Sequence, residues 1–209
     1  MIEIDRPVPD EELNPGPAVT PRPAATVIVL REPPTGLQVL LVKRNPRARF
    51  MGGAWVFPGG AVDRAEGRGD RARRAAALRE LREEAGIRLP AAAALIPFSR
   101  WITPPEVKIR FDTWFYLAIV APDAEAQIDG KEVVEARWYG PRDALAAART
   151  GEIMLVFPTV KHLEQLTAFR TARELIDDAR GRKIRPVLPR VVGTGRDARI
   201  VVPGEPGYG

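Results

Sequence analysis

The chain has 209 residues, 45% of them apolar, and it contains no cysteine. This length and apolar content are enough for one domain with its own core, and the lack of cysteine excludes disulfides, thiol catalysis and thiolate metal sites. The formal net charge is +5, but the arginines alternate with acids and alanines and form no dense basic tract. We therefore expect a small anionic partner and argue against a nucleic-acid partner.

The first 23 residues contain six prolines, which predict an extended N-terminal arm. This arm has no positively charged segment followed by an apolar core, and no apolar run in the chain approaches the length of a membrane span. We expect a cytoplasmic protein with no membrane segment, present as a monomer or a homodimer.

Two short β-branched runs at 24–30 and 37–42 are separated by proline and glycine, and they predict a pair of strands. A third strand is expected at 54–57, where a Pro-Gly-Gly turn stops it and lets the backbone turn tightly. A helix is then expected from Arg71 to Ala85, with Asp70 as its N-cap and a glycine as its C-terminal stop.

Later segments predict further strands and two helices. The expected strands lie at 95–101, 111–120 and 133–139, with short strand-like runs at 191–192 and 200–202. One helix should begin at Pro141 and end near Gly151, and a longer one should be capped by Thr159 and run to Ile176.

Glu80, Glu83 and Glu84 stand at i, i+3 and i+4 of the first helix, so they share one face and repel one another. They also lie near the helix C-terminus, where the helix dipole disfavours negative charge. A hard divalent cation such as Mg²⁺ or Mn²⁺ would reverse both effects, because it binds carboxylate oxygens. The alternative is a solvated face whose acids are neutralised by Arg79 and Arg82.

The glycine turn and the acidic helix together resemble the Nudix hydrolase family, whose motif can be written G-x5-E-x7-R-E-U-x-E-E-x-G-U, with U aliphatic. Gly60 and Glu66 satisfy the first spacing, and residues 79–87 match every fixed position of the second half. Twelve residues, in place of seven, separate Glu66 from Arg79. We therefore expect a five-residue insertion at 67–71, which lengthens the loop before the helix.

The resemblance implies an α/β fold, a Nudix-type α/β/α sandwich with a mixed β-sheet. It places a Nudix hydrolase domain at 24–180, between the proline-rich arm at 1–23 and a C-terminal extension at 181–209. It also implies a metal site and two structural residues. The metal ligands would be the carbonyl of Gly60 with Glu80, Glu83 and Glu84, and the structural residues would be Arg79 and Gly86.

Further segments look like the coenzyme A and acyl-CoA diphosphatase branch of the family. They lie at 50–63, 101–105, 110–115 and 203–208. The histidine- and glutamine-containing coenzyme A signature of another Nudix branch is missing before Phe57.

We therefore expect a metal-dependent hydrolase that cleaves a phosphoanhydride bond in a nucleoside diphosphate linked to another group, with coenzyme A or acyl-CoA as a candidate substrate. The alternatives are an ADP-ribose or dinucleoside polyphosphate pyrophosphatase and a non-catalytic regulator that binds a nucleotide. The catalytic candidates are Glu83, Glu84 and Glu106, with Glu132 and Glu135 as further candidates for the general base. The candidates for substrate binding are Arg44, Arg49 and Trp101.

Overall fold

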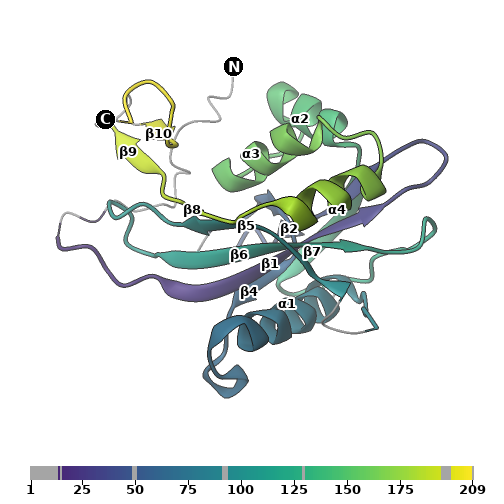
Figure 1. Cartoon of the computed structure of the whole chain (residues 1–209), viewed down its shortest axis with the longest axis horizontal. Coiled ribbons are helices and arrows are strands. Elements are labelled where there is room, and N and C mark those ends of the chain that lie inside the picture. Colours follow the sequence, from purple (N-terminus) through teal and green to yellow (C-terminus); the bar gives the residue numbers. More distant parts are fainter. Residues whose placement is uncertain are drawn as a thin grey trace.

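The computed structural model describes residues 14, 16–48, 51–90, 94–128, 130–193 and 199–208. A mixed β-sheet lies between α1 on one face and α2, α3 and α4 on the other (Figure 1). This confirms the predicted α/β/α sandwich. The helices are α1 (Gly69–Ala85), α2 (Pro141–Thr150), α3 (Phe157–Leu166) and α4 (Ala172–Gly181), with a short 3₁₀ turn at Arg64–Glu66.

The main sheet has eight strands, in the order β3-β2-β1-β6-β5-β8, with β4 paired to β1 and β7 paired to β2. β1 and β6 are parallel, as are β5 and β8, while the other pairs in this sheet are antiparallel. A separate antiparallel pair is formed by β9 and β10. The strands are β1 (Arg22–Arg31), β2 (Gln38–Arg44), β3 (Trp55–Val56), β4 (Gly59–Ala61), β5 (Ile96–Ile102), β6 (Phe111–Ile119), β7 (Val133–Tyr139), β8 (Pro186–Val187), β9 (Arg190–Val192) and β10 (Arg199–Val201).

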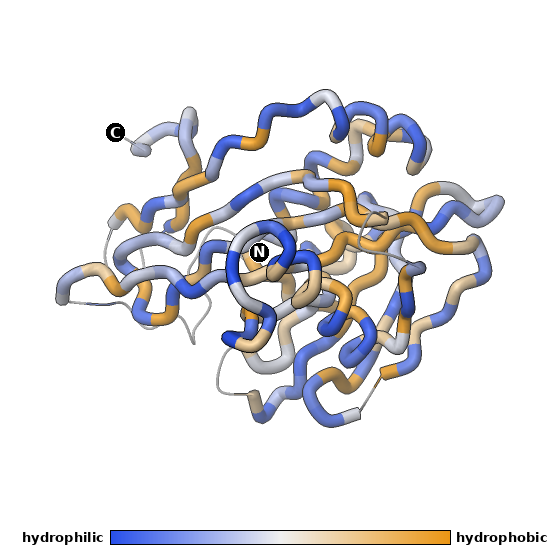
Figure 2. Tube along the Cα trace, turned by 60° about the horizontal axis from the view of Figure 1, so that its bottom comes forward, coloured by the Kyte–Doolittle hydropathy of each residue, from blue (hydrophilic) through white to orange (hydrophobic). Residues whose placement is uncertain are grey.

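Strand β1 lies in the middle of the sheet and is buried on both faces. Val27 and Val29 point into the core under α1, while Ile28 and Leu30 point into the core under α2, α3 and α4. Because both faces are covered, the strand is a nearly continuous apolar run. Figure 2 shows hydrophobic segments through the interior of the molecule and hydrophilic ones over much of its outer turns.

Helix α1 begins at Gly69, and its N-cap is Arg68, so the prediction of Asp70 as the cap was wrong. Asp70 lies in the first turn, where its carboxylate accepts hydrogen bonds from Tyr116 and Arg74. The predicted C-terminal stop is confirmed, because Gly86 adopts the left-handed conformation with φ 66°. That conformation favours glycine because it has no Cβ.

The long helix expected from Thr159 to Ile176 is two helices, so this prediction was wrong. Thr159 lies inside α3, whose N-cap is Val156, and the chain leaves the helix after Leu166. Thr171 then caps α4 by accepting a hydrogen bond from the Glu174 amide, while the Glu174 carboxylate accepts one from Thr171. This capping box was the missed signal, since the apolar spacing continues across the break.

The remaining predicted elements are present with small shifts at their ends. Pro141 occupies the start of α2, and Gly151 closes it in the left-handed conformation. The end of the N-terminal arm lies along the loop between β5 and β6, where the Asn14 amide donates to the Glu106 carbonyl at 2.6 Å and the Arg22 amide donates to the Arg110 carbonyl at 2.9 Å. The arm therefore meets the sheet beside this loop.

Candidate active site

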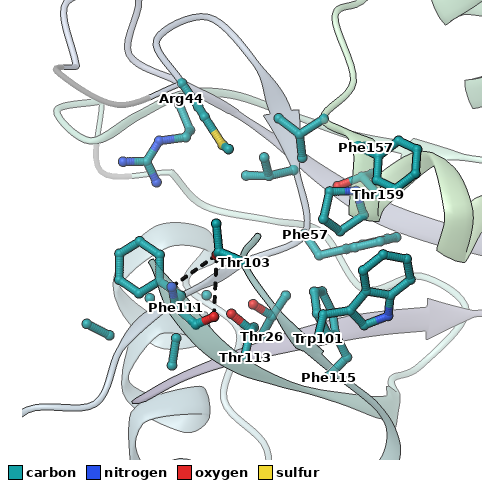
Figure 3. A pocket seen from close by; sticks show the side chains of 18 of the residues that line it. Thr26, Arg44, Phe57, Trp101, Thr103, Phe111, Thr113, Phe115, Phe157 and Thr159 are labelled. Atoms are coloured by element: carbon teal, nitrogen blue, oxygen red, sulfur yellow. Dashed lines mark hydrogen bonds between the residues drawn. The ribbon is translucent and has the colours of Figure 1, made fainter. Parts of the chain in front are cut away.

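A pocket of about 380 Å³ lies where strands of the main sheet meet α1 and the first turn of α3. Its charged lining residues are Arg44, Glu80, Glu84 and Glu132. In Figure 3 Arg44 and Phe111 lie on one side of the pocket, and Phe57, Trp101 and Phe157 lie on the other. The pocket thus has a charged end and an aromatic end.

The glycine turn lies very close to β1 and to the side chain of Glu80. A Cβ on Gly59 would lie 2.6 Å from the Ala25 carbonyl oxygen, and a Cβ on Gly60 would lie 2.3 Å from Oε1 of Glu80. Gly60 also pairs with Ala25 in the β1–β4 ladder. Gly59 is therefore required by close backbone packing, whereas the neighbour of Gly60 is the flexible end of the Glu80 side chain, so Gly60 places the turn against the acidic part of α1.

Glu84 is the most deeply buried carboxylate of the site, with 3% of its surface exposed. Burial raises its pKa to about 7. A hydrogen bond from the Gly59 amide to its Oε2 atom, at 2.9 Å, acts in the opposite direction because it favours the ionised form. Glu80 and Glu132 raise the pKa further through charge repulsion, while Arg44 lowers it. A carboxylate held in this way would be stabilised by a cation in the pocket.

Glu80 lies beside Glu84 in the pocket lining, and its side chain is 12% exposed. Burial raises its pKa, while a hydrogen bond from Nη1 of Arg79 to Oε1, at 2.7 Å, acts in the opposite direction. Repulsion from Glu83 and Glu132 adds to the rise. The charged end therefore holds two carboxylates whose ionised forms are destabilised by burial.

Glu83 is placed differently from the other two helix acids. Its side chain is 49% exposed, it does not line the pocket, and it forms ion pairs with Arg79 at 3.2 Å and Arg82 at 3.5 Å. The three acids share one helix region as expected, but the structure brings only Glu80 and Glu84 into the pocket.

Arg79 fastens the helix to the turn that precedes it. Its guanidinium donates to Glu66 at 3.1 Å and to the Ala61 carbonyl at 3.0 Å, in addition to its bonds with Glu80 and Glu83. Burial alone would lower its pKa, but hydrogen bonds to Glu66 and Glu80 raise it. These contacts fix the side chain and suit the structural role that the motif implies.

The inserted residues 67–71 leave the pairing of Glu66 with Arg79 intact. Glu66 closes the 3₁₀ turn by accepting a hydrogen bond from the Asp63 amide at 2.7 Å. The insertion then forms a short link and the first turn of α1, and Asp70 within it accepts a hydrogen bond from Tyr116 at 3.0 Å. The extra residues are thus tied back to the sheet.

Of the other predicted site residues, some line the pocket and others do not. Arg44 and Trp101 line the pocket, and Arg49 lies outside the described residues. Glu106 does not line the pocket, and its buried Oε2 atom has no hydrogen-bond partner in the part of the chain that the structure describes. Glu132, weighed as a further candidate for the base, does line the pocket.

Most of the aromatic end was not predicted from the sequence. Phe57, Phe115, Phe157 and Ile200 line it, and they come from four separate segments of the chain. At this end the sequence selected Trp101, but not Phe57, Phe157 or Ile200, because an apolar residue in a strand or helix reads as core unless its neighbours in space are known. No local signal distinguishes the others.

His162 lies behind the aromatic end and is fully buried. Burial lowers its pKa to about 4, and its ring is in hydrogen-bond contact with Oγ of Ser99 and the Pro158 carbonyl oxygen, both at 2.6 Å. Its ring centroid is 4.2 Å from that of Phe115. It is a packing residue.

The charged end was tested for its fit to a divalent cation. As the side chains stand, the described residues include no group of three or more His, Cys, Asp or Glu arranged to hold a metal ion. Glu80 and Glu84 still suit one, because hard cations take carboxylate oxygens and would compensate the charge that burial destabilises. The full set of ligands stays a prediction.

The fold and this pocket define a class of hydrolase, and comparison with known proteins gives the family. A model of the NUDIX domain matches residues 20–157, so the chain belongs to the Nudix family and is a Nudix hydrolase. Nudix hydrolases generally use divalent metal ions. Among the described residues, no helix has the length and apolarity needed to span a bilayer.

Three similar proteins illustrate the match. A Caenorhabditis elegans protein described as nudix hydrolase 7 is 28% identical, over 83% of this chain and 69% of that protein. The acyl-coenzyme A diphosphatase NUDT19 of Xenopus laevis is 32% identical over 91 residues, which cover 42% of this chain and 24% of that protein. The crystal structure of a NUDIX hydrolase from Alicyclobacillus acidocaldarius has a TM-score of 0.67 and 27% identity, and the match covers 76% of this chain and 96% of that one.

Proposed function

We propose that the protein hydrolyses a phosphoanhydride bond in a nucleoside diphosphate linked to another group, with Mg²⁺ or Mn²⁺ as cofactor and coenzyme A or acyl-CoA as the substrate. One observation carries this proposal: two buried carboxylates, Glu80 and Glu84, share a pocket with a group of aromatic side chains. The carboxylates suit a diphosphate with its divalent counter-ion, and the aromatic rings suit an uncharged group attached to that diphosphate.

Glu80 and Glu84 would hold the metal ion, with Glu83 and the Gly60 carbonyl as the further ligands that the motif implies. A bound divalent ion would polarise the phosphoryl oxygens and lower the pKa of a water molecule. Arg79 keeps the Glu80 carboxylate in position, because it donates to that carboxylate at 2.7 Å.

The reaction also needs a group that takes a proton from water. In the step itself the water oxygen joins one phosphorus, the bridging phosphorus–oxygen bond breaks, and two phosphomonoesters leave. Glu132 lines the pocket and interacts electrostatically with both Glu80 and Glu84, whereas Glu106 does not line it. We therefore place Glu132 ahead of Glu106 as the base from outside α1, with Glu83 and Glu84 as the candidates within the helix.

The choice of coenzyme A compounds rests on three further observations. The 91-residue similarity to an acyl-coenzyme A diphosphatase supports this branch, as do the sequence segments that resemble it. Arg44, which lines the charged end, is suited to a substrate phosphate. ADP-ribose and dinucleoside polyphosphates contain the same kind of bond, so they are the alternatives to be compared.

The test is a substrate panel of coenzyme A, acyl-CoA, ADP-ribose, NADH and diadenosine polyphosphates, assayed with Mg²⁺ and with Mn²⁺, with products identified by mass. We expect coenzyme A to yield 3′,5′-ADP and 4′-phosphopantetheine. Turnover of ADP-ribose or of diadenosine polyphosphates alone would move the assignment to the alternative substrate class. If neither metal supports turnover of any compound, the hydrolase proposal is wrong and a nucleotide-binding regulator replaces it.

A further inference from the structure

The C-terminal extension, defined above as residues 181–209, supplies part of the pocket wall. Pro189, which follows β8, and Ile200, in β10, both line the pocket. Ile200 is 6% exposed and belongs to the same core cluster as Phe57, Trp101 and Phe157. The family model ends at residue 157, so this wall lies outside the matched domain.

The extension is attached at two places, one of them beside a residue of the pocket lining. Strand β8 runs parallel to β5, with Val187 opposite Trp101, a residue of the aromatic end. Beyond β10, Glu205 forms an ion pair with Lys161 of α3 at 2.9 Å and accepts a hydrogen bond from the Val202 amide at 3.0 Å. Ile200 is therefore held between two attachments.

The charged residues of the pocket lining form a single group. Glu84 interacts electrostatically with the three other charged lining residues, Glu80, Arg44 and Glu132, so these four side chains form one group. The described lining at the aromatic end, which includes Ile200 and Pro189, is uncharged. A charged group would lose its hydration there without a partner, whereas an apolar group would gain from burial.

We infer that the C-terminal extension is a specificity-determining wall: Ile200 and Pro189 close the aromatic end around the uncharged, largely apolar group that the substrate carries beside its diphosphate. This inference rests on the proposed function. Two kinds of group share the required chemistry, the acylated pantetheine arm of an acyl-CoA and a nucleobase. A change at Ile200 alters the room for that group and leaves the charged end as it is.

The test compares Ile200→Ala with Val201→Ala. Val201 is the next residue of β10, it is 3% exposed, and it does not line the pocket. Both variants shorten a buried side chain of the same strand, so a general loss of stability affects both. Pro189→Ala is a second pocket variant, in case Ile200→Ala is poorly folded.

The readout is the preference among substrates that differ only in the uncharged group. We measure kcat and KM for acyl-CoAs of two and eight carbons, and for diadenosine and diguanosine polyphosphates. Two KM ratios are compared, one between the two acyl-CoAs and one between the two dinucleoside polyphosphates. Ile200→Ala is expected to change one of these ratios roughly 10-fold, because it removes methylene groups from the pocket wall, and to change kcat less than about twofold. Val201→Ala is expected to leave both ratios within about twofold, because it does not reach the pocket.

A changed acyl-chain ratio would identify the acyl arm as the occupant, and a changed base ratio would identify the nucleobase. Unchanged ratios in both Ile200→Ala and Pro189→Ala, with the proteins folded, would overturn the inference. If the wild-type protein hydrolyses none of the compounds, the proposed function fails. In that case calorimetric binding of the same pairs, with Mg²⁺ present, gives the ratios without hydrolysis and still decides the role of the wall.

Discussion

The two ends of the pocket are built in opposite ways. At the charged end, the carboxylates Glu80 and Glu84 come from one helix, beside the glycine turn, and burial raises their pKa values. Arg44 of β2 and Glu132, just before β7, complete that end. The aromatic end is assembled from distant segments, and the His162 ring behind it is hydrogen-bonded at both nitrogens. Carboxylates whose pKa values are raised by burial are typical of a binding site. A buried polar ring with a hydrogen-bond partner at each nitrogen is typical of a core.

The contrast between the two ends of the pocket predicts that the largest loss of turnover follows from a change at Glu84. Glu84→Gln keeps the size of the side chain and removes its charge, so we expect kcat to fall roughly 10²–10³-fold, as when one electrostatic contact to a transition state is removed. Circular dichroism should show an intact fold. The control is Glu125→Gln, because that side chain is 76% exposed and does not line the pocket. Equal turnover in both variants would remove Glu84 from the site.

Glu83→Gln tests a residue that belongs to the motif but does not line the pocket. Glu83 is half-exposed and paired with Arg79, so the loss of turnover should be smaller than for Glu84→Gln. A larger loss would show that Glu83 turns into the pocket when the metal and the substrate are bound.

His162 gives a pH-dependent effect at the other end. Its pKa is lowered from 6.5 to about 4, so the unfolded chain binds more protons than the folded one between these values. The free energy of unfolding should therefore fall as the pH falls from 6.5 to 4, by about 3 kcal/mol from this residue. Urea denaturation at pH 7, 5.5 and 4.5 measures it.

The matched variant for this effect is His162→Gln, which keeps a polar side chain but cannot titrate. It should be less stable at pH 7 and should lose less stability on acidification than the wild-type protein. Parallel pH curves for the two proteins would contradict the assigned burial of a neutral imidazole.

Substitution of Arg79 tests whether its hydrogen bonds stabilise the charged end of the pocket. Arg79→Lys keeps the positive charge but cannot reproduce the fork that reaches Glu66, Glu80 and the Ala61 carbonyl. We expect a loss of about 2 kcal/mol in the free energy of unfolding, measured by urea titration. Arg82→Lys, at a half-exposed ion pair, should change it by less than about 0.5 kcal/mol. Equal effects would contradict a structural role specific to Arg79.

The smallest effect concerns the insertion before α1. Tyr116→Phe removes the hydrogen bond to Asp70 at 3.0 Å and should cost about 1 kcal/mol of stability. The control is Tyr139→Phe, whose hydroxyl contacts the exposed Arg137 at 3.1 Å, and thermal denaturation compares the two. If Tyr116→Phe has no larger effect than Tyr139→Phe, the tether between the insertion and the sheet does not contribute to stability.

The difference between the two ends also explains what could be predicted from the sequence. Glu80, Glu84 and Arg79 lie within one helix, and the glycine turn shortly before it, so order and spacing were enough to select them. Six strands of the main sheet followed from short apolar runs bounded by turn residues, whereas β4, expected as a turn, and β8 were not predicted. These signals are local, and the structure places them as expected.

The aromatic end could not be predicted, because its members meet only in the folded chain. Phe57 and Ile200 are 143 positions apart, yet both line one pocket. The same limit explains the error at Asp70, whose carboxylate looked like a helix cap but is engaged by Tyr116 from the sheet. It also explains Glu106 and Glu132, since only the fold decides which loop carboxylate reaches the pocket.

Binding of Mn²⁺, followed by electron paramagnetic resonance, tests whether Glu80 and Glu84 hold a divalent cation. We predict saturable binding to the wild-type protein, at least about tenfold weaker binding to Glu84→Gln and to Glu80→Gln, and unchanged binding to Glu125→Gln. Equal Mn²⁺ affinity in the wild-type protein and the two pocket variants would contradict a metal site at the charged end of the pocket.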